Sequence, residues 1–507
     1  MNKSCLTLLQ LWPVSVRMVI NVTYENGGNI MKPNQLRFTV PALMLTASAL
    51  LLTGCSGKNE HGLDPKDPQE VVVWHYYNGA QAIAFEEAVT EFNNTIGVNK
   101  GILVTAQSKS SIDDLIAALD ASSNEEVGAE DMPNIFQCYT DMAVSLDQKG
   151  ILIDLNKYVD QKTRDLYVDG YVEEGMWDED GSWKLFPVAK STEVLGINKT
   201  AWDEFCLATG ADINDFSTWE GIARLSEDYY NWSGGQSFFG RDAFANYLII
   251  GSKQLGTEIF EVHDNQVTLH LDKAVMRRLW DNFYVPYVKG YYKHVGRYRS
   301  DDVKIGEIVC CACSTSGMTY FPKEVTKDDA DPTSIERMVL PIPNFEGTDA
   351  YAVQQGASMA VSKTDERAEY ASVLFLEWFT SPEHNTAYSI QSSYLPVTKE
   401  VDSLDKVKQY LTEDIEIDDI RADTLDVALK QVARSTLYAP KGFTNGNAAR
   451  SVLETSMLEA ATADRKAILD QTGNGVSLEA ALTHYLSDAR FEEWFDDLNA
   501  QLTELCR

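Results

Sequence analysis

Aromatic and hydroxyl side chains follow directly after three apolar stretches that we expect to be strands. They are Tyr76, Tyr77 and Asn78 after the first stretch, Ser110 after the second, and Tyr139 and Asp141 after the third. The carboxyl ends of parallel strands meet at one edge of a sheet, so these side chains should lie together there. Flat rings can stack on the C–H faces of a sugar, while hydroxyl, amide and carboxylate groups meet its directed hydrogen bonds. The pattern favours a carbohydrate ligand, although a single tyrosine at a strand end more often caps the core.

The elements that must position these residues can be read from the hydrophobic pattern. Continuous apolar runs predict strands buried on both faces of a parallel sheet, and apolar residues at helical spacing lie between them. The expected elements are strands at residues 71–74, 102–104, 134–136 and 194–197, helices at 85–96 and 112–119, a mostly helical stretch at 217–288, and late helices around 373–378 and 491–502. The alternation over the first half of the chain predicts an α/β half with a parallel sheet, and alternation returns after residue 187.

Six short motifs follow one another along the chain. They are WH at 74–75, MPNI at 132–135, PVAKSTEVLGINK at 187–199, QGAS at 355–358, FLEW followed by SPE within 375–383, and SYLPV at 393–397. In this order they resemble the family 1 extracellular solute-binding proteins of ATP-driven (ABC) importers, the relatives of maltose- and glycerol-3-phosphate-binding proteins. The segment at 187–199 is the most specific match, whereas Asn134 stands where the family usually has an aspartate.

The resemblance implies a two-lobed, periplasmic-binding-protein-like type II fold with the ligand cleft between the lobes. Lobe 1 is expected at residues 70–187 and 352–395, and lobe 2 at 188–351 and 396–507. A solute that touches both lobes would select the closed state, and the closed protein would present both lobes to the permease subunits. The implied protein is a monomeric binder that needs no cofactor.

The resemblance also implies which residues contact the solute. They are Tyr76, Tyr77, Asn78, Ser110, Tyr139 and Asp141 from lobe 1, Lys190, Ser191, Thr192 and Glu193 at the hinge, Arg241, Asp242, Phe244, Ser314 and Ser316 from lobe 2, and Gly356 and Tyr394 at the return crossings. Aromatic rings would stack on the ligand, Asp141, Asp242 and Glu193 would accept its hydroxyls, and Arg241 would donate. Arg241 could equally form a structural ion pair with Asp242 or another acid.

One departure from the family bears on the substrate. In the glycerol-3-phosphate branch a late arginine meets the phosphate, but the matching loop at 441–447 has no arginine before Arg450. A phosphate needs concentrated positive charge or helix N-termini. Neutral carbohydrate is therefore favoured over glycerol-3-phosphate or a glycerophosphodiester, although Lys190, Arg241 and Lys441 keep the phosphate ligands open.

Two other functions compete with solute binding. A secreted glycosidase would need two carboxylates about 5 to 9.5 Å apart, and only Asp141 and Glu193 suggest themselves. The nucleophile-elbow, zinc-protease and phosphate-loop motifs are absent from the sequence, and we expect no catalytic residues. An adhesin would instead present a large exposed apolar patch.

The cysteine cluster Cys310, Cys311 and Cys313 suggests metal chemistry at first sight. Zinc sites space their ligands differently and need a second ligand pair, which the sequence lacks. Because Ile308 and Val309 precede the cluster, we expect a buried strand in which the thiols act as small apolar groups, and no metal site.

The beginning of the chain has the pattern of a lipoprotein signal. Lys32 and Arg37 precede an uncharged run of 15 residues at 38–52, and Leu-Thr-Gly comes directly before Cys55. The run is shorter than the ~20 residues of a membrane-spanning helix, and small residues before a cysteine resemble a lipidation site. We expect residues 1–30 to be a mis-assigned start, 31–54 a signal peptide, Cys55 the lipidated residue and 55–69 a tether, which places the protein on the outer face of the cytoplasmic membrane.

The formal net charge of −33 limits the remaining partners. Such a surface repels nucleic acid and anionic lipid headgroups, so we expect membrane attachment through the lipid alone. A solvated acidic surface says nothing about the ligand itself.

Overall fold

The computed structural model describes residues 60–178, 180–263, 266–327, 331–410 and 417–507. The predicted start extension, the signal peptide, Cys55 and the first part of the tether lie outside the described residues. Within those ranges, none of the helices combines the length and the hydropathy that crossing a membrane requires.

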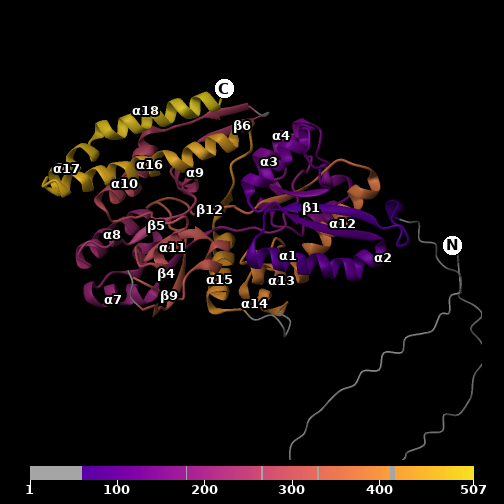
Figure 1. Cartoon of the computed structure of the whole chain (residues 1–507), viewed down its shortest axis with the longest axis horizontal. Coiled ribbons are helices and arrows are strands. Elements are labelled where there is room, and N and C mark those ends of the chain that lie inside the picture. Colours follow the sequence, from indigo (N-terminus) through magenta and orange to yellow (C-terminus); the bar gives the residue numbers. More distant parts are fainter. Residues whose placement is uncertain (1–59, 179, 264–265, 328–330, 411–416) are drawn as a thin grey trace, which may run out of the picture. The chain divides into compact units, whose positions relative to one another are not determined.

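Lobe 1 is built on a four-stranded sheet (Figure 1). Its strands lie in the order β13 (Ser358–Val361), β3 (Ile135–Cys138), β1 (Gln69–His75) and β2 (Ile102–Ser108). β1 runs parallel to both β2 and β3, whereas β13 returns antiparallel to β3. The helices of this lobe are α1 (Gly79–Phe92), α3 (Ile112–Ser123), α4 (Thr140–Gln148), α12 (Glu366–Phe379) and α13 (Pro382–Ser392).

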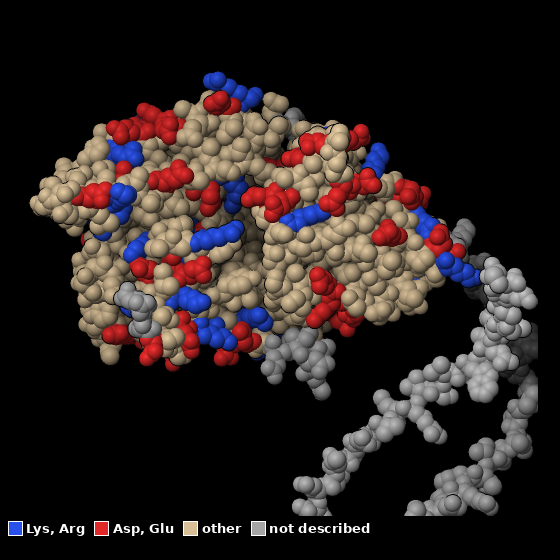
Figure 2. All heavy atoms as spheres, viewed as in Figure 1, with Lys and Arg blue, Asp and Glu red and all other residues tan. Residues whose placement is uncertain are grey.

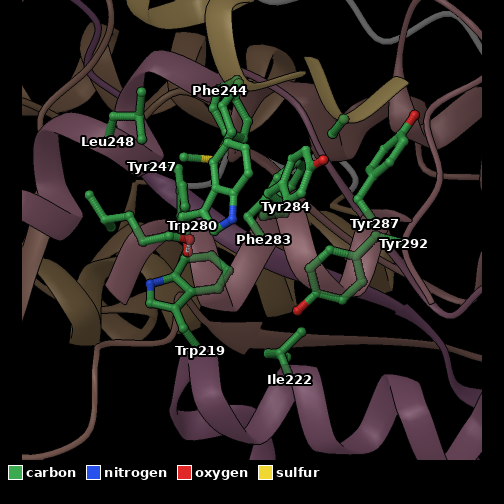
Figure 3. Close-up of a cluster of buried hydrophobic side chains, with 14 of the residues drawn as sticks. Trp219, Ile222, Phe244, Tyr247, Leu248, Trp280, Phe283, Tyr284, Tyr287 and Tyr292 are labelled. Carbon is green, nitrogen blue, oxygen red and sulfur yellow. Dashed lines mark hydrogen bonds between the residues drawn. The ribbon is translucent and has the colours of Figure 1, made fainter. Parts of the chain in front are cut away.

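Lobe 2 has a second four-stranded sheet, in the order β11 (Arg337–Pro341), β4 (Glu193–Asn198), β8 (Cys310–Ser314) and β5 (Phe239–Arg241). The larger elements around it are α7 (Lys199–Thr209), α8 (Trp219–Trp232), α9 (Phe244–Gln254), α10 (Lys273–Lys289), α15 (Asp419–Arg434), α16 (Gly446–Gly473) and α18 (Asp488–Leu505). Their apolar faces form an aromatic core that includes Trp219, Phe244 and Trp280 (Figure 3).

Shorter elements complete the two lobes. The remaining helical segments are η1 (Glu60–Gly62), η2 (Asn93–Gly97), α2 (Val98–Lys100), η3 (Leu155–Lys157), α5 (Gln161–Arg164), α6 (Asp169–Glu173), η4 (Ile213–Ser217), α11 (Arg299–Lys304), η5 (Ser316–Tyr320), α14 (Leu404–Gln409) and α17 (Leu478–Tyr485). The remaining strands are β6 (Phe260–His263), β7 (Gln266–Leu269), β9 (Glu324–Val325), β10 (Thr333–Ser334), β12 (Tyr351–Val353) and β14 (Thr436–Tyr438).

Several chain crossings between the lobes are held together by backbone pairing. Lys190 pairs with Leu395, Ser191 pairs with Gln355, and β12 runs parallel to β14. Gly356 lies where these crossings are most crowded: its φ is +88°, and a Cβ there would come within 3.1 Å of the Lys190 Cα. Only glycine fits both the left-handed backbone and the close approach, so Gly356 is required by the hinge itself.

The structure confirms the predicted strands, which appear as β1, β2, β3 and β4, and the buried cysteine strand, which is β8. The stretch at 217–288 is mostly helical, as predicted, with α8, α9 and α10, and the short strands β5, β6 and β7 interrupt it. β5 has only three residues, so it carries too little periodicity to be recognised in sequence.

Residues 60–69, predicted from composition as the end of a flexible tether, instead pack against lobe 1. Leu63 is buried in the lobe 1 core, and the His61 ring lies 4.2 Å from that of Tyr370. Arg367 on α12 pairs with Asp67 at 2.9 Å. The composition of this segment reflects its many exposed polar residues and therefore predicted a flexible tether. The burial of the single residue Leu63 is enough to attach the segment to lobe 1.

Candidate solute-binding site

Three predicted tyrosines meet at the carboxyl edge of the lobe 1 sheet. The Tyr76 and Tyr139 hydroxyl oxygens lie 3.2 Å apart, and the Tyr394 side chain interacts with both Tyr76 and Ser316. Tyr76 follows β1 and Tyr139 follows β3, which is why the parallel register brings them together. Ser316 belongs to η5 of lobe 2, so this tyrosine group joins the two lobes.

The electrostatics of the tyrosine group keep it neutral. Burial raises the pKa of Tyr76, Tyr139 and Tyr394 well above the ordinary value, while hydrogen bonds within the group act in the opposite direction on Tyr76 and Tyr394. A neutral hydroxyl both donates and accepts hydrogen bonds. Tyr76 and Tyr139 are half-buried, whereas Tyr394 packs in the lobe 1 core, so the group offers two partly exposed rings with neutral hydroxyls, the chemistry that polyhydroxylated solutes require.

Asp141 lies in the first turn of α4, next to this group. Its Oδ1 accepts a hydrogen bond from the Phe443 N–H at 3.1 Å. Burial raises the pKa of Asp141 to about 6, although the Phe443 N–H and the Arg450 guanidinium both act in the opposite direction. Burial outweighs these two contacts, so the charged form of Asp141 is destabilised overall. Asp141 lies where lobe 1 meets the segment before α16.

A cavity of about 200 Å³ opens beside Thr140, the residue between Tyr139 and Asp141. Its walls come from lobe 1, from β14 and from the segment that follows β14; they are Thr140, Gly170, Glu173, Glu174, Met176, Trp177, Gln354, Leu437, Tyr438, Ala439, Pro440 and Lys441. The cavity is smaller than the ~300–1,000 Å³ of drug-sized ligand sites, so it suits a small solute or one unit of a longer one. Trp177 gives it an aromatic wall, and Glu173 and Lys441 give it charged groups of both signs.

Glu174 connects this cavity to the hinge. Its Oε2 accepts from the Lys190 Nζ and from the Gln354 Nε2, the latter at 2.9 Å. Lys190 also donates to the Gly356 carbonyl at 3.0 Å and is fully buried. The predicted ligand contact Lys190 is thus neutralised by an internal ion pair, which removes one of the positive charges that kept a phosphate ligand open.

The predicted lobe 2 charges are likewise engaged within the protein. Arg241 Nη2 lies 2.8 and 2.9 Å from the two Glu193 carboxylate oxygens, and Asn246 also donates to Glu193. Arg241 is therefore a structural pair with an acid, the alternative that the sequence left open. Asp242 instead accepts from the backbone N–H of Arg299 at 3.0 Å, and burial raises its pKa to about 6.

Most of the other predicted contacts pack in a core or form hydrogen bonds within the protein. Phe244 and Tyr77 are each 1% exposed and lie in the cores of lobe 2 and lobe 1. Asn78 donates to the Tyr76 and Ser110 carbonyls, at 3.1 and 2.6 Å, and so builds the turn after β1. Thr192 accepts from Gln431, and Ser191 is held by its backbone pairing with Gln355. Ser314 lies next to Ser316, with 3.1 Å between their hydroxyl oxygens.

Sequence reasoning missed the residues that line the cavity, Trp177 above all. Trp177 lies ten residues before the hinge motif that begins at Pro187, in a segment without periodicity. Arg450 follows the loop at 441–447 in sequence and is not among the predicted contacts. In the structure it lies in the second turn of α16 and acts electrostatically on both Tyr139 and Asp141. A helix from Gly446 would have placed Arg450 one turn from its N-terminus, and that was the available signal.

The surface agrees with a site between the lobes. On the face shown in Figure 2 the molecule is hollowed between lobe 1 and lobe 2, with acidic and basic side chains near the rim. Two sheets, several crossings and a recess between them are the features of a two-lobed protein of the solute-binding type.

The comparisons with known proteins identify the family. The family model described as bacterial extracellular solute-binding protein matches residues 87–413. The chain therefore belongs to the bacterial extracellular solute-binding proteins. A comparison with curated protein sequences finds no significant match.

Solved structures share the fold at low sequence identity. UgpB from Mycobacterium tuberculosis, in complex with glycerophosphocholine, aligns with a TM-score of 0.63 and 18% identity over 87% of this chain and 100% of that chain. The cyclic alpha-maltosyl-1,6-maltose binding protein from Arthrobacter globiformis aligns with a TM-score of 0.60 and 18% identity. The alignment covers 86% of this chain and 100% of that chain. An ABC substrate-binding protein from Listeria monocytogenes in complex with cycloalternan aligns with a TM-score of 0.60 and 16% identity, over 86% of this chain and 100% of that chain.

Proposed function

We propose that this protein binds a neutral carbohydrate outside the cell and delivers it unchanged to the permease of an ABC importer. The observation that carries the proposal is the tyrosine group, in which Tyr76 and Tyr139 present hydroxyls 3.2 Å apart beside Tyr394. Neutral rings and hydroxyls match the C–H faces and hydroxyls of a sugar. Membership in the solute-binding family supports the transport role.

The adjoining cavity supports the same ligand class. Trp177 offers an apolar face, and Glu173 and Lys441 can accept from and donate to hydroxyls at the rim. In contrast, Lys190 and Arg241 are already paired with Glu174 and Glu193, so neither adds free positive charge for an anionic ligand. We assign the ligand to the tyrosine group together with this cavity.

Anchoring and domain division follow the sequence. The proposal includes lipid attachment at Cys55 after removal of the signal peptide, a monomer at the outer face of the cytoplasmic membrane, and the lobe boundaries at residues 187 and 188, 351 and 352, and 395 and 396. Metabolic labelling with a radioactive fatty acid tests the anchor, since Cys55→Ser should abolish the label.

Screening by thermal shift tests the ligand class. A sugar present at 100 times its Kd should stabilise the protein by about 2.7 kcal/mol and raise the melting temperature. The sugar should be recovered unchanged after incubation. Appearance of a hydrolysed product would favour a glycosidase instead, and absence of any shift across mono- and oligosaccharides would contradict the proposal.

A glycerophosphodiester is the second candidate, because one observation favours it. Arg450 acts on both Tyr139 and Asp141, and the N-terminus of α16 lies beside Asp141, so positive potential reaches the site. The same screen should include glycerophosphocholine. If only that compound shifts the melting temperature, and Arg450→Gln removes the shift, the phosphodiester replaces the sugar as the ligand.

A further inference from the structure

The two lobes touch at a short segment that contains two glycines. Phe443 packs in the lobe 2 core with its ring 5.2 Å from that of Phe260, so residues 442–446 move with lobe 2. The opposing residues are Thr140 and Asp141, at the start of α4 in lobe 1. We name residues 442–446 the glycine clasp.

Both glycines lie where a side chain would collide with lobe 1. A Cβ on Gly442 would come within 2.8 Å of the Thr140 carbonyl carbon and oxygen and 3.0 Å of the Asp141 nitrogen. These are backbone atoms and cannot rotate away. A Cβ on Gly446 would overlap the Asp141 carboxylate, with its Oδ2 only 2.8 Å away. The close approach therefore requires a glycine at 442, whereas a side chain at 446 would force the Asp141 carboxylate out of its contacts.

Asp141 fixes the position of the clasp through directed contacts. Its Oδ1 accepts from the Phe443 N–H, and its carboxylate lies at the N-terminus of the 28-residue helix α16. The positive end of a helix favours an anionic group. Arg450, further along the same helix, adds attraction to the Asp141 charge.

We propose that the glycine clasp and Asp141 form an interlobe contact that sets how far the two lobes close, with Asp141 as its positioning residue. In this role Asp141 holds the lobes together instead of accepting a hydroxyl of the solute. Contacts from η5 accompany it, since Thr319 Oγ1 donates to Ser393 Oγ at 2.9 Å. The clasp depends on the two lobes alone, so it stands or fails independently of the solute.

Small-angle scattering of the purified protein without added solute tests the clasp. Gly442→Ala and Gly446→Ala should shift the radius of gyration to a larger value, because each methyl group separates the lobes. Gly473→Ala is the matched control: it lies in the same helix α16 and a Cβ there has nothing within 4 Å, so the radius should not change. Circular dichroism shows that each variant is folded.

A double variant separates closure from simple loss of stability. Asp141→Ala alone is the baseline, because it removes the carboxylate that holds the clasp and should itself enlarge the radius of gyration. Adding Gly446→Ala to Asp141→Ala should cause no further increase, since the new methyl group then meets no carboxylate, whereas adding Gly442→Ala should increase the radius further, since Gly442 faces backbone. An unchanged radius in Gly442→Ala, or a further increase when Gly446→Ala is added to Asp141→Ala, would overturn the proposal.

Discussion

The two lobes use the same kinds of residue for different purposes. In lobe 1 the residues after β1 and β3 leave Tyr76 and Tyr139 with neutral hydroxyls next to the other lobe. In lobe 2 the last residue of β5 and those after it contact other parts of the protein: Arg241 pairs with Glu193, Asp242 accepts from Arg299, and Phe244 fills the core. A residue at a strand end is therefore a weaker candidate for a ligand contact in lobe 2 than in lobe 1. The charged residues of lobe 2 form ion pairs and hydrogen bonds within the protein, whereas the tyrosines of lobe 1 lie at the edge of their lobe.

This difference has an energetic origin. A buried charge without a partner is strongly destabilising, so a fold that buries Arg241 must also bury an acid. A tyrosine can bury its ring and leave its hydroxyl at the cleft. The proposed site therefore draws its tyrosines mainly from lobe 1, and the buried ions of lobe 2 support its shape.

The largest expected effect is on the buried pair of lobe 2. Arg241→Met leaves Glu193 buried and without its bidentate partner, and we expect it to lower the free energy of unfolding by about 3 to 5 kcal/mol. Urea denaturation measures the change. The double variant Arg241→Met with Glu193→Gln is the control and should recover most of the loss. A single-variant loss below about 1 kcal/mol would show that the pair is not structural.

In lobe 1, Tyr77 should behave as a core residue. Tyr77→Ala removes a ring that is 1% exposed and packs 5.3 Å from Phe85, so it should cost about 3 to 5 kcal/mol of unfolding free energy. Tyr77→Phe keeps the ring and should cost little. Denaturation curves distinguish the two, and a stable Tyr77→Ala variant with weakened sugar binding would instead return Tyr77 to the ligand contacts.

The cleft tyrosines should show the opposite profile. Tyr139→Phe removes a neutral hydrogen-bonding group, and we expect sugar affinity to fall up to about tenfold, corresponding to about 0.5 to 1.5 kcal/mol, with little change in stability. Titration calorimetry measures it. Tyr291→Phe is the control, because it loses a hydrogen bond to Glu227 within lobe 2. Equal losses of affinity in both variants would argue against a cleft role for Tyr139.

The smallest effect near neutral pH concerns one histidine in each lobe, His75, which is buried, and His294, which is half-buried. Burial lowers the pKa of His75 in lobe 1 and of His294 in lobe 2 from 6.5 to about 4, with Arg299 adding to the shift of His294. Between these values the unfolded histidines bind protons that the folded ones do not, so their contribution to stability should fall as pH drops from about 6.5 toward 4. Asp141 and Asp242, whose pKa is raised to about 6, contribute in the opposite direction, so the histidine contribution is the difference between the wild type and a histidine variant.

Melting temperatures measured from pH 7 to pH 4 test the histidines. His75 Nδ1 accepts from the Tyr77 N–H at 3.2 Å, and protonation would remove that acceptor. His75→Gln, which cannot titrate, should flatten part of the decline. If the slope is the same in His75→Gln and in the wild type, His75 does not contribute to acid sensitivity.

Much of the fold could be predicted from local patterns. The strands β1 to β4 were found because continuous apolar runs are visible without knowledge of their partners. The cysteine strand β8 was found in the same way. The short strands β5, β6 and β7 were missed, since three or four residues carry no reliable period.

The site was predicted less completely, and for a different reason. Tyr76 and Tyr139 could be paired in advance because parallel strands order their ends. Trp177, Glu174 and Arg450 could not, because each reaches the site from a segment whose path depends on the packing of both lobes.

Local sequence patterns are enough to predict the parallel strands of lobe 1, the hinge motif and the types of residue at the strand ends, because these depend on neighbours along the chain. The partners of the charged groups follow from the folded arrangement of the chain. Whether Arg241 meets a solute or Glu193, and whether Asp141 meets a solute or the helix α16, depends on contacts between residues far apart in sequence. A buried charge loses its hydration and is stable only beside a compensating partner in the folded protein. Because that partner is distant in sequence, no local sequence pattern identifies it.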